Sequence, residues 1–143
     1  MLKKFLFVLL FIPLQVFASQ QGIIKLTNAE RVKNHMPVLK ENKELNKAAM
    51  LKAKDMIKNN YWSHTSPKGV TPWYWFDKAG YDYKYAGENL AKNFSCDKDV
   101  IKAWMKSRGH KSNILDKDFK EIGVAEVKWK KGLLIVQVFG TEI

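Results

Sequence analysis

Residues 121–140 have the sequence EIGVAEVKWKKGLLIVQVFG, and they determine the fold class. Two runs rich in Val, Ile and Leu flank the short turn KKG, which is the pattern of a β-hairpin. The second run, LLIVQVFG, is apolar on both faces of an extended chain, so we predict a central strand that is covered on both sides. The sequence therefore predicts a sheet near the C-terminal end of the chain.

The segments before this hairpin favour helices. In residues 41–60, small and apolar side chains recur at steps of three and four, which predicts a helix with one inward face. That face consists of Leu45, Ala48, Ala49, Lys52, Ala53, Met56 and Ile57. Further helices are predicted at 26–37 with Thr27 or Asn28 as cap, at 72–80 between Pro72 and Gly80, and at 95–107 with Ser95 or Asp97 as cap. Helices followed by a paired sheet make an α+β domain, with residues 81–92 irregular or a short strand between them.

The N-terminal segment has the pattern of a secretory signal peptide. A basic start, MLKK, precedes the apolar run FLFVLLFIPLQVF, and a small residue, Ala18, ends the segment. The run is short for a membrane span and contains Pro13. We therefore predict residues 1–18 as the signal peptide, with cleavage after Ala18, and residues 19–143 as one exported domain, either periplasmic or released.

Charge and cysteine content narrow the classes of partner. The formal net charge is +11, carried almost entirely by scattered lysines, with arginine only at Arg31 and Arg108. This pattern is typical of a solvated surface, or of attraction to an anionic cell envelope, and it gives little support to nucleic-acid binding. The single cysteine, Cys96, cannot form an internal disulfide, so the domain depends on packing for its stability.

Three residues could form a cleft. His64 in WSHTS and His110 in SRGHKSN each follow a small residue in a predicted turn, where side chains often face a binding site, whereas His35 beside Pro37 is expected to be exposed and inert. Glu88 in AGENLA adds a carboxylate, and two imidazoles with one carboxylate form a set that binds zinc. Their spacing is wide, so the set has meaning only if the fold brings the three together.

Five motifs in order resemble one known family. They are SHTSPKG, AGENLA, AWMKSRGHKSNIL, FKEIGVA and LLIVQVFG, and with the NAER start and the alanine-rich helix the likeness spans residues 26–139. This order resembles the CAP superfamily of SCP-like domains, in its bacterial branch. The resemblance implies a three-layer α-β-α sandwich with a small, mainly antiparallel sheet between helices. It also implies a cleft where His64, Glu88 and His110 converge.

One position departs from the family pattern. Many members carry a second glutamate three residues after the helix tryptophan, here Trp104, and this chain has Ser107 there. The lost negative charge is expected to weaken any divalent-ion site. Three roles stay open for Glu88: a hydrogen-bond acceptor that braces the cleft, a weak metal ligand together with His64 and His110, and a catalytic acid or base. We expect Gly87 to permit a tight turn and Asn89 to bond local backbone, and Asn113 to bond backbone near His110.

The aromatic residues admit scaffold and surface roles. Trp104 and Phe139 are predicted to be core. The run WYWF at 73–76 is either core packing or the lining of an apolar or sugar ligand site, and Trp129 in KWKKG is either a solvated turn or a contact to an anionic surface.

The sequence shows no complete catalytic constellation. We expect a secreted module that binds a small ligand, lipid or protein through a cleft of His64, Glu88, Ser107 and His110, with at most a weakly bound divalent cation. The alternative is a metal-assisted hydrolase that acts on an envelope component. The sequence indicates neither the ligand nor the oligomeric state.

Overall fold

The computed structural model describes residues 19–143, so the predicted signal peptide lies outside the described residues. The elements are α1 (Gln20–Lys33), β1 (Lys40–Glu41), α2 (Lys43–Lys58), α3 (Trp73–Ala79), β2 (Tyr83–Phe94), α4 (Asp97–Lys106), α5 (Arg108–Ile114), β3 (Glu121–Trp129) and β4 (Gly132–Glu142). Between residues 19 and 143, no helix is both long and apolar enough to cross a membrane.

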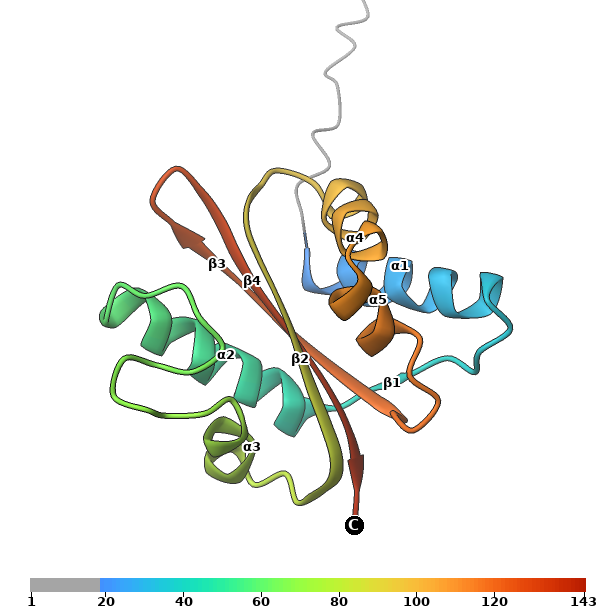
Figure 1. The fold of residues 1–143 in the computed structure, drawn as a ribbon, viewed down its shortest axis with the longest axis horizontal. Helices are drawn as coiled ribbons and strands as arrows, with labels where there is room; N and C mark the ends of the chain where they lie inside the picture. Colours follow the sequence, from blue (N-terminus) through green and yellow to red (C-terminus); the bar gives the residue numbers. More distant parts are fainter. Residues whose placement is uncertain (1–18) are drawn as a thin grey trace, which may run out of the picture.

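The sheet has four strands in the order β1-β3-β4-β2 (Figure 1). β3 and β4 form the predicted antiparallel hairpin, and β2 pairs antiparallel with the other side of β4, while the short β1 runs parallel to β3. The prediction that residues 133–140 form a central strand is confirmed, because β4 has a neighbour on each side and is buried from Leu134 to Gly140.

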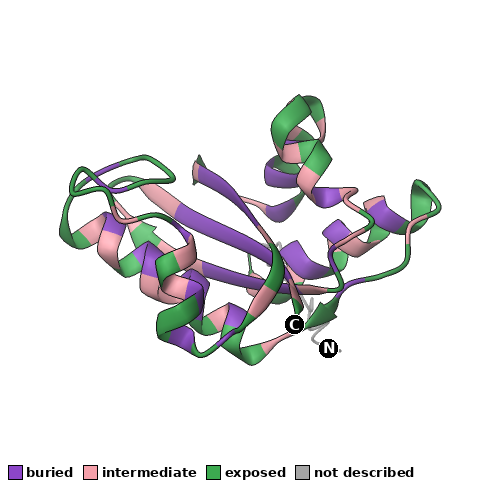
Figure 2. Cartoon of the chain, turned by 60° about the horizontal axis from the view of Figure 1, so that its bottom comes forward, coloured by how far each residue is buried: buried purple, intermediate pink, exposed green. Residues whose placement is uncertain are grey.

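Helices cover both faces of the sheet, which confirms the three-layer arrangement. α1, α4 and α5 lie on one side in Figure 1, and α2 and α3 lie on the other. Each side has its own apolar core: Trp104 and Phe139 belong to the α1/α4/α5 side, and Phe76 and Tyr81 to the α2/α3 side. Figure 2 shows the buried residues concentrated on the strands and on the helix faces turned toward them.

The first helix starts earlier than predicted. α1 begins at Gln20, and Ser19 is its N-cap, with the Ser19 Oγ accepting a hydrogen bond from the Gly22 backbone N–H at 3.0 Å. Thr27, a predicted cap, instead lies fully buried inside the helix. The polar start QQG carries no apolar periodicity, so the sequence pattern did not reveal the first turns.

The other helices follow the prediction more closely. The predicted inward face of α2 is buried from Leu45 to Met56, and Ile57 is half-buried. α3 ends at Gly80, whose φ of 84° is a left-handed conformation suited to glycine. For α4 the predicted caps are wrong: the N-cap is Cys96, which makes no side-chain capping hydrogen bond.

Residues 83–94 form a long strand, where the sequence predicted an irregular segment or a short strand. β2 lies at the edge of the sheet, and side chains from the helices bond two of its carbonyls. Asn113 Nδ2 donates to the Glu88 carbonyl at 3.1 Å, and Trp104 Nε1 donates to the Leu90 carbonyl at 3.0 Å. These bonds hold β2 against α4 and α5 and fix the position of Glu88.

Candidate functional site: a His64–Glu88 cleft

His64 and Glu88 meet, although they are far apart in the sequence. His64 Nδ1 lies 2.7 Å from Glu88 Oε1, and the two side chains form a hydrogen-bonded ion pair when the imidazole is protonated. His64 lies on the loop after α2 and its side chain is 56% exposed, whereas that of Glu88, in the middle of β2, is only 2% exposed. The pair therefore connects a buried carboxylate to the surface.

Burial dominates the electrostatics of Glu88. Desolvation raises the pKa of Glu88 above its ordinary value, and the hydrogen bond from His64 and the positive charge of Lys52 oppose this shift. In the described structure the second carboxylate oxygen, Oε2, is buried and has no hydrogen-bond partner. A buried carboxylate oxygen without a hydrogen-bond partner is uncommon in proteins.

Lys52 supports the loop that carries His64. Its Nζ donates to the backbone carbonyls of Ser63, at 3.0 Å, and of His64, and it lies 3.3 Å from the Tyr61 hydroxyl. Lys52 is buried, and desolvation lowers its pKa while the negative charges of Glu88 and Asp55 raise it. The sequence pattern predicted that Lys52 lies on the inward face of its helix but did not indicate this role. The signal that could have revealed it is the presence of a lysine among alanines on a face that is otherwise buried.

The pair faces a cavity of about 420 Å³. The lining residues are His64, Thr65, Thr71, Pro72, Trp73, Ala86, Gly87, Glu88 and Asn113. Trp73 gives the cavity one aromatic wall, so part of the WYWF run lines the site, while Phe76 of the same run is fully buried in the core. Threonine hydroxyls, an imidazole and an indole ring together suit a small ligand with polar and apolar parts.

The expected roles of the residues beside Glu88 are corrected by the structure. Gly87 lies within the strand and makes no tight turn. A Cβ at this position would lie 2.7 Å from Phe119 Cζ, so glycine is needed because the Phe119 ring packs on the backbone there.

Asn89 also has a tertiary role instead of a local one. Fully buried, its Nδ2 donates to the His110 carbonyl at 3.2 Å and to Gln137 Oε1 at 3.0 Å, while its Oδ1 accepts from Asn113 Nδ2 at 2.9 Å. Gln137 Nε2 in turn donates to Thr27 Oγ1 at 2.8 Å. A buried chain of hydrogen bonds thus runs from α1 through β4 and β2 to α5. Asn113 bonds the Glu88 carbonyl and Asn89, and not backbone near His110 as expected.

His110 lies near the pair but is not part of it. The ring is half-buried, with its centroid 6.3 Å from that of Trp104, and it is not among the residues that line the cavity. Desolvation lowers the pKa of His110, and the charge of His64 lowers it further. Ser107 ends α4 and precedes α5, is half-buried, and does not line the cavity either. His35 is exposed, as expected.

The side chains around Glu88 include few ligands for a divalent cation. Within residues 19–143, no group of three or more His, Cys, Asp or Glu side chains is arranged to hold a metal ion. His64 and Glu88 supply two ligands, and the His64 nitrogen that faces Glu88 is already hydrogen-bonded. In this arrangement these residues do not form a closed metal site.

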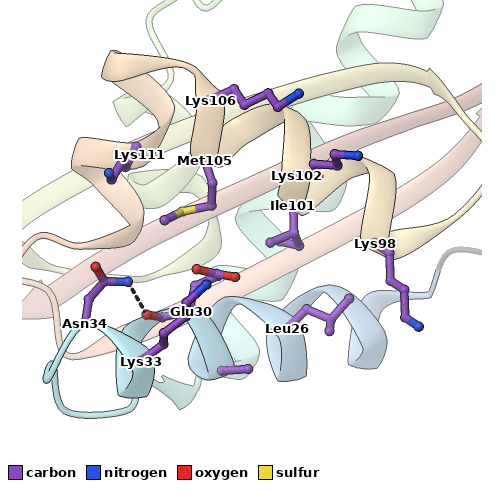
Figure 3. A pocket seen from close by; sticks show the side chains of 11 residues that line it. Leu26, Glu30, Lys33, Asn34, Lys98, Ile101, Lys102, Met105, Lys106 and Lys111 are labelled. Carbon is purple, nitrogen blue, oxygen red and sulfur yellow. Dashed lines mark hydrogen bonds between the residues drawn. The ribbon is translucent and has the colours of Figure 1, made fainter.

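A second cavity, of about 540 Å³, lies between α1 and α4 (Figure 3). Leu26, Ala29, Ile101 and Met105 form its apolar part, and five lysines, Lys33, Lys98, Lys102, Lys106 and Lys111, surround it. None of the site residues predicted from the sequence lines this cavity.

Comparisons of the sequence identify relatives. The chain is 41% identical over 116 residues to the uncharacterized protein YkwD of Bacillus subtilis (strain 168), covering 81% of this chain and 45% of the relative. It is 32% identical over 106 residues to the uncharacterized membrane protein YlbC of the same strain, covering 74% of this chain and 31% of the relative. The chain thus spans less than half the length of these curated relatives.

Solved structures share the fold. An extracellular protein containing an SCP domain from Bacillus anthracis superposes with a TM-score of 0.78 at 32% identity, covering 86% of this chain and 40% of that one. An outer surface protein from Borrelia burgdorferi gives a TM-score of 0.79 at 24% identity, covering 86% of this chain and 92% of that one. Residues 24–139 match the model of CAP, the cysteine-rich secretory protein family, and the chain therefore belongs to that family.

Proposed function

We propose that this CAP domain is a binding module of the cell exterior that takes a small ligand into the His64–Glu88 cleft. The observation that carries the proposal is the Glu88 carboxylate: one oxygen is bonded to His64 at 2.7 Å, and the other is buried and unpartnered next to a cavity of about 420 Å³. A ligand hydroxyl or amide N–H would satisfy this oxygen, and Trp73 would contact an apolar part of the ligand.

The location at the cell exterior is supported by the signal-peptide pattern and by the relatives. The similar proteins of Bacillus anthracis and Borrelia burgdorferi are described as extracellular and as an outer surface protein. An exported domain meets envelope lipids and glycans first, so these are the ligand classes to test.

The test is an NMR titration of ¹⁵N-labelled protein with two probes, a soluble N-acetylglucosamine trisaccharide and dihexanoyl-phosphatidylglycerol below its critical micelle concentration. We expect one probe to shift the amide resonances of Thr65, Thr71, Trp73 and Asn113, and His64→Ala to weaken that binding at least tenfold. His35→Ala is the matched control, because His35 is exposed on another part of the surface. Unchanged cleft resonances with both probes, or equal binding by the two variants, would contradict the proposal.

We further propose that the tip of the β3–β4 hairpin contacts an anionic membrane surface. Lys92 Nζ lies 4.7 Å from the ring centroid of Trp62 and 5.8 Å from that of Trp129, and Lys130 Nζ lies 4.5 Å from that of Trp129. A cavity of about 600 Å³ lies beside the hairpin, and its lining includes the apolar side chains of Phe94 and Leu133 together with Lys128, Lys130 and Lys131. Tryptophan and lysine together favour the interface of a negatively charged bilayer.

This contact is tested by sedimentation with vesicles of phosphatidylcholine and phosphatidylglycerol, with pure phosphatidylcholine as the neutral control. Each lysine near such a surface contributes about 1 kcal/mol, so the triple variant Lys128→Gln/Lys130→Gln/Lys131→Gln should bind at least tenfold more weakly. The matched control is Lys98→Gln/Lys102→Gln/Lys106→Gln, which removes the same charge beside the α1–α4 cavity. An equal loss in both triple variants would show a general charge effect and overturn the assignment to the hairpin.

A further inference from the structure

Asp97 is a buried carboxylate with an unusual partner. The residue is only 6% exposed, and its Oδ1 accepts a hydrogen bond of 2.7 Å from the backbone nitrogen of Ser19. The one ion pair found among residues 19–143 joins His64 and Glu88, so within this part of the chain Asp97 has no lysine, arginine or histidine within 4.0 Å. Buried carboxylates normally have a cationic partner, because desolvation of a lone charge is costly.

The surroundings of Asp97 add negative charge and leave little room. Burial, together with the negative charge of Asp97, raises the pKa of Glu126 to about 7. Glu126 Oε2 is itself buried without a hydrogen-bond partner in the described residues. On the other side, a Cβ on Gly22 would lie 1.6 Å from Asp97 Oδ2, so the carboxylate packs directly on the backbone of the first turn of α1. Asp97 thus interacts with a second carboxylate, Glu126, and is hydrogen-bonded to the Ser19 nitrogen.

Ser19 is also the residue that the sequence predicts as the mature N-terminus. Its position is fixed, because its Oγ accepts from the Gly22 N–H and its carbonyl accepts from the Ile23 N–H at 2.9 Å. Hydrolysis of the Ala18–Ser19 bond by a signal peptidase adds hydroxyl to the Ala18 carbonyl carbon and hydrogen to the Ser19 nitrogen. The amine formed then takes up a proton, so an amide becomes a cation at that nitrogen.

We propose that Asp97 is the binding site for the new α-ammonium group of Ser19, so that removal of the signal peptide completes the fold. In the precursor this nitrogen is a neutral amide, and Asp97 has only a hydrogen bond. In the mature chain the same atoms form a partly buried ion pair that connects the start of α1 to the start of α4. The proposal rests on cleavage after Ala18 and is independent of the cleft.

The test compares two forms of the protein, one that starts at Ser19 and one that keeps Ala18 and so displaces the ammonium group by one residue. We expect the extra residue to lower Tm by about 3–5 °C, since a loss near 1 kcal/mol has this effect in a domain of this size. The same comparison in Asp97→Asn should show little difference. The matched control is Asp99→Asn, an exposed acid in the same first turn of α4, where the full difference should remain.

A second measurement does not depend on the stability of Asp97→Asn. A neutral-pH acylating reagent should modify the free Ser19 amine at least tenfold more slowly than the amine of the form that keeps Ala18, because the ion pair with Asp97 favours the protonated, unreactive form of the amine. Equal acylation rates, an equal fall in Tm in the wild type and Asp97→Asn, or an exported protein whose N-terminal sequence starts elsewhere than Ser19 would each overturn the proposal.

Discussion

The ammonium group of Lys52 donates a hydrogen bond to the backbone carbonyl of His64. Lys52 lies on α2, and this bond, with a second one to the Ser63 carbonyl, fixes the loop between α2 and α3. The exposed imidazole of the cleft is therefore held in place by a buried cation, and the same cation lies close enough to Glu88 to oppose the rise of its pKa.

Replacement of Lys52 should loosen this loop. Lys52→Met keeps the length of the side chain and removes the donor, so the carbonyls of Ser63 and His64 lose their partner. We expect the free energy of unfolding in urea to fall by about 1–3 kcal/mol, and hydrogen exchange to rise selectively in residues 61–66. Lys54→Met, on the exposed face of the same helix, is the control. If the loop stays protected in Lys52→Met, Lys52 does not position His64.

The Glu88 carboxylate should lower stability at neutral pH. The pKa of Glu88 in the folded protein lies above the ordinary value of 4.5, which applies to the unfolded chain. At a pH between the unfolded and the folded pKa, the folded protein therefore binds more protons than the unfolded chain. Stability therefore falls as the pH rises above 4.5. We expect Glu88→Gln to be more stable than the wild type at pH 7.5 by about 1 kcal/mol, with no gain at pH 4, and to bind the cleft probe more weakly. A variant that is less stable than the wild type at both pH values would contradict this account.

Gly87 should tolerate no side chain unless Phe119 yields. Gly87→Ala places a Cβ 2.7 Å from the Phe119 ring, and we expect a loss of about 1–3 kcal/mol in urea unfolding. The second substitution Phe119→Leu should recover part of this loss, because it removes the ring atoms that clash. Gly109→Ala has open space around it and is expected to be neutral or slightly stabilising. Equal effects of the two alanine substitutions would argue against the packing explanation.

Zinc should bind weakly and through His64. Two adjacent protein ligands give a weak site, so we expect Tm to rise only at millimolar zinc. His64→Ala should abolish this rise, whereas His110→Ala should keep it, because the His110 ring lies against Trp104 and outside the cavity. If Tm of the wild type rises at micromolar zinc and both variants lose this rise, His110 must move to join a three-ligand site. That result would support the metal-assisted hydrolase.

The sequence predicted the parts of this fold in which apolar residues recur periodically. The hairpin of residues 121–140 and the inward face of α2 were visible because apolar residues recur at the spacing of strands and helices. The full length of β2 was not visible, and only a short strand or an irregular segment was predicted, because glycine, glutamate and asparagine are poor strand formers and find partners there only through tertiary contacts. The first turns of α1 were missed for the related reason that their contacts are polar.

The site was predictable in part. The family motifs predicted that His64 and Glu88 belong to one cleft, and in the structure the two side chains are in contact. The role of Gly87 depends on Phe119, and that of Asn89 on Gln137 and Asn113, and no local pattern connects these positions. Lys52 and Trp73 were seen as members of a helix face and an aromatic run, and only the fold shows that one holds the loop and the other lines the cavity.

The side-chain bonds to the edge of the sheet have a consequence for solubility. Trp104 Nε1 and Asn113 Nδ2 occupy the carbonyls of Leu90 and Glu88, which are the acceptors that a strand from another molecule would use. The two donors come from different helices, α4 and α5. Local detachment of either helix from β2 would therefore expose an unpaired carbonyl in a long extended segment. We therefore expect the Trp104 indole and the Asn113 amide to reduce strand pairing between molecules as well as to hold β2 in place.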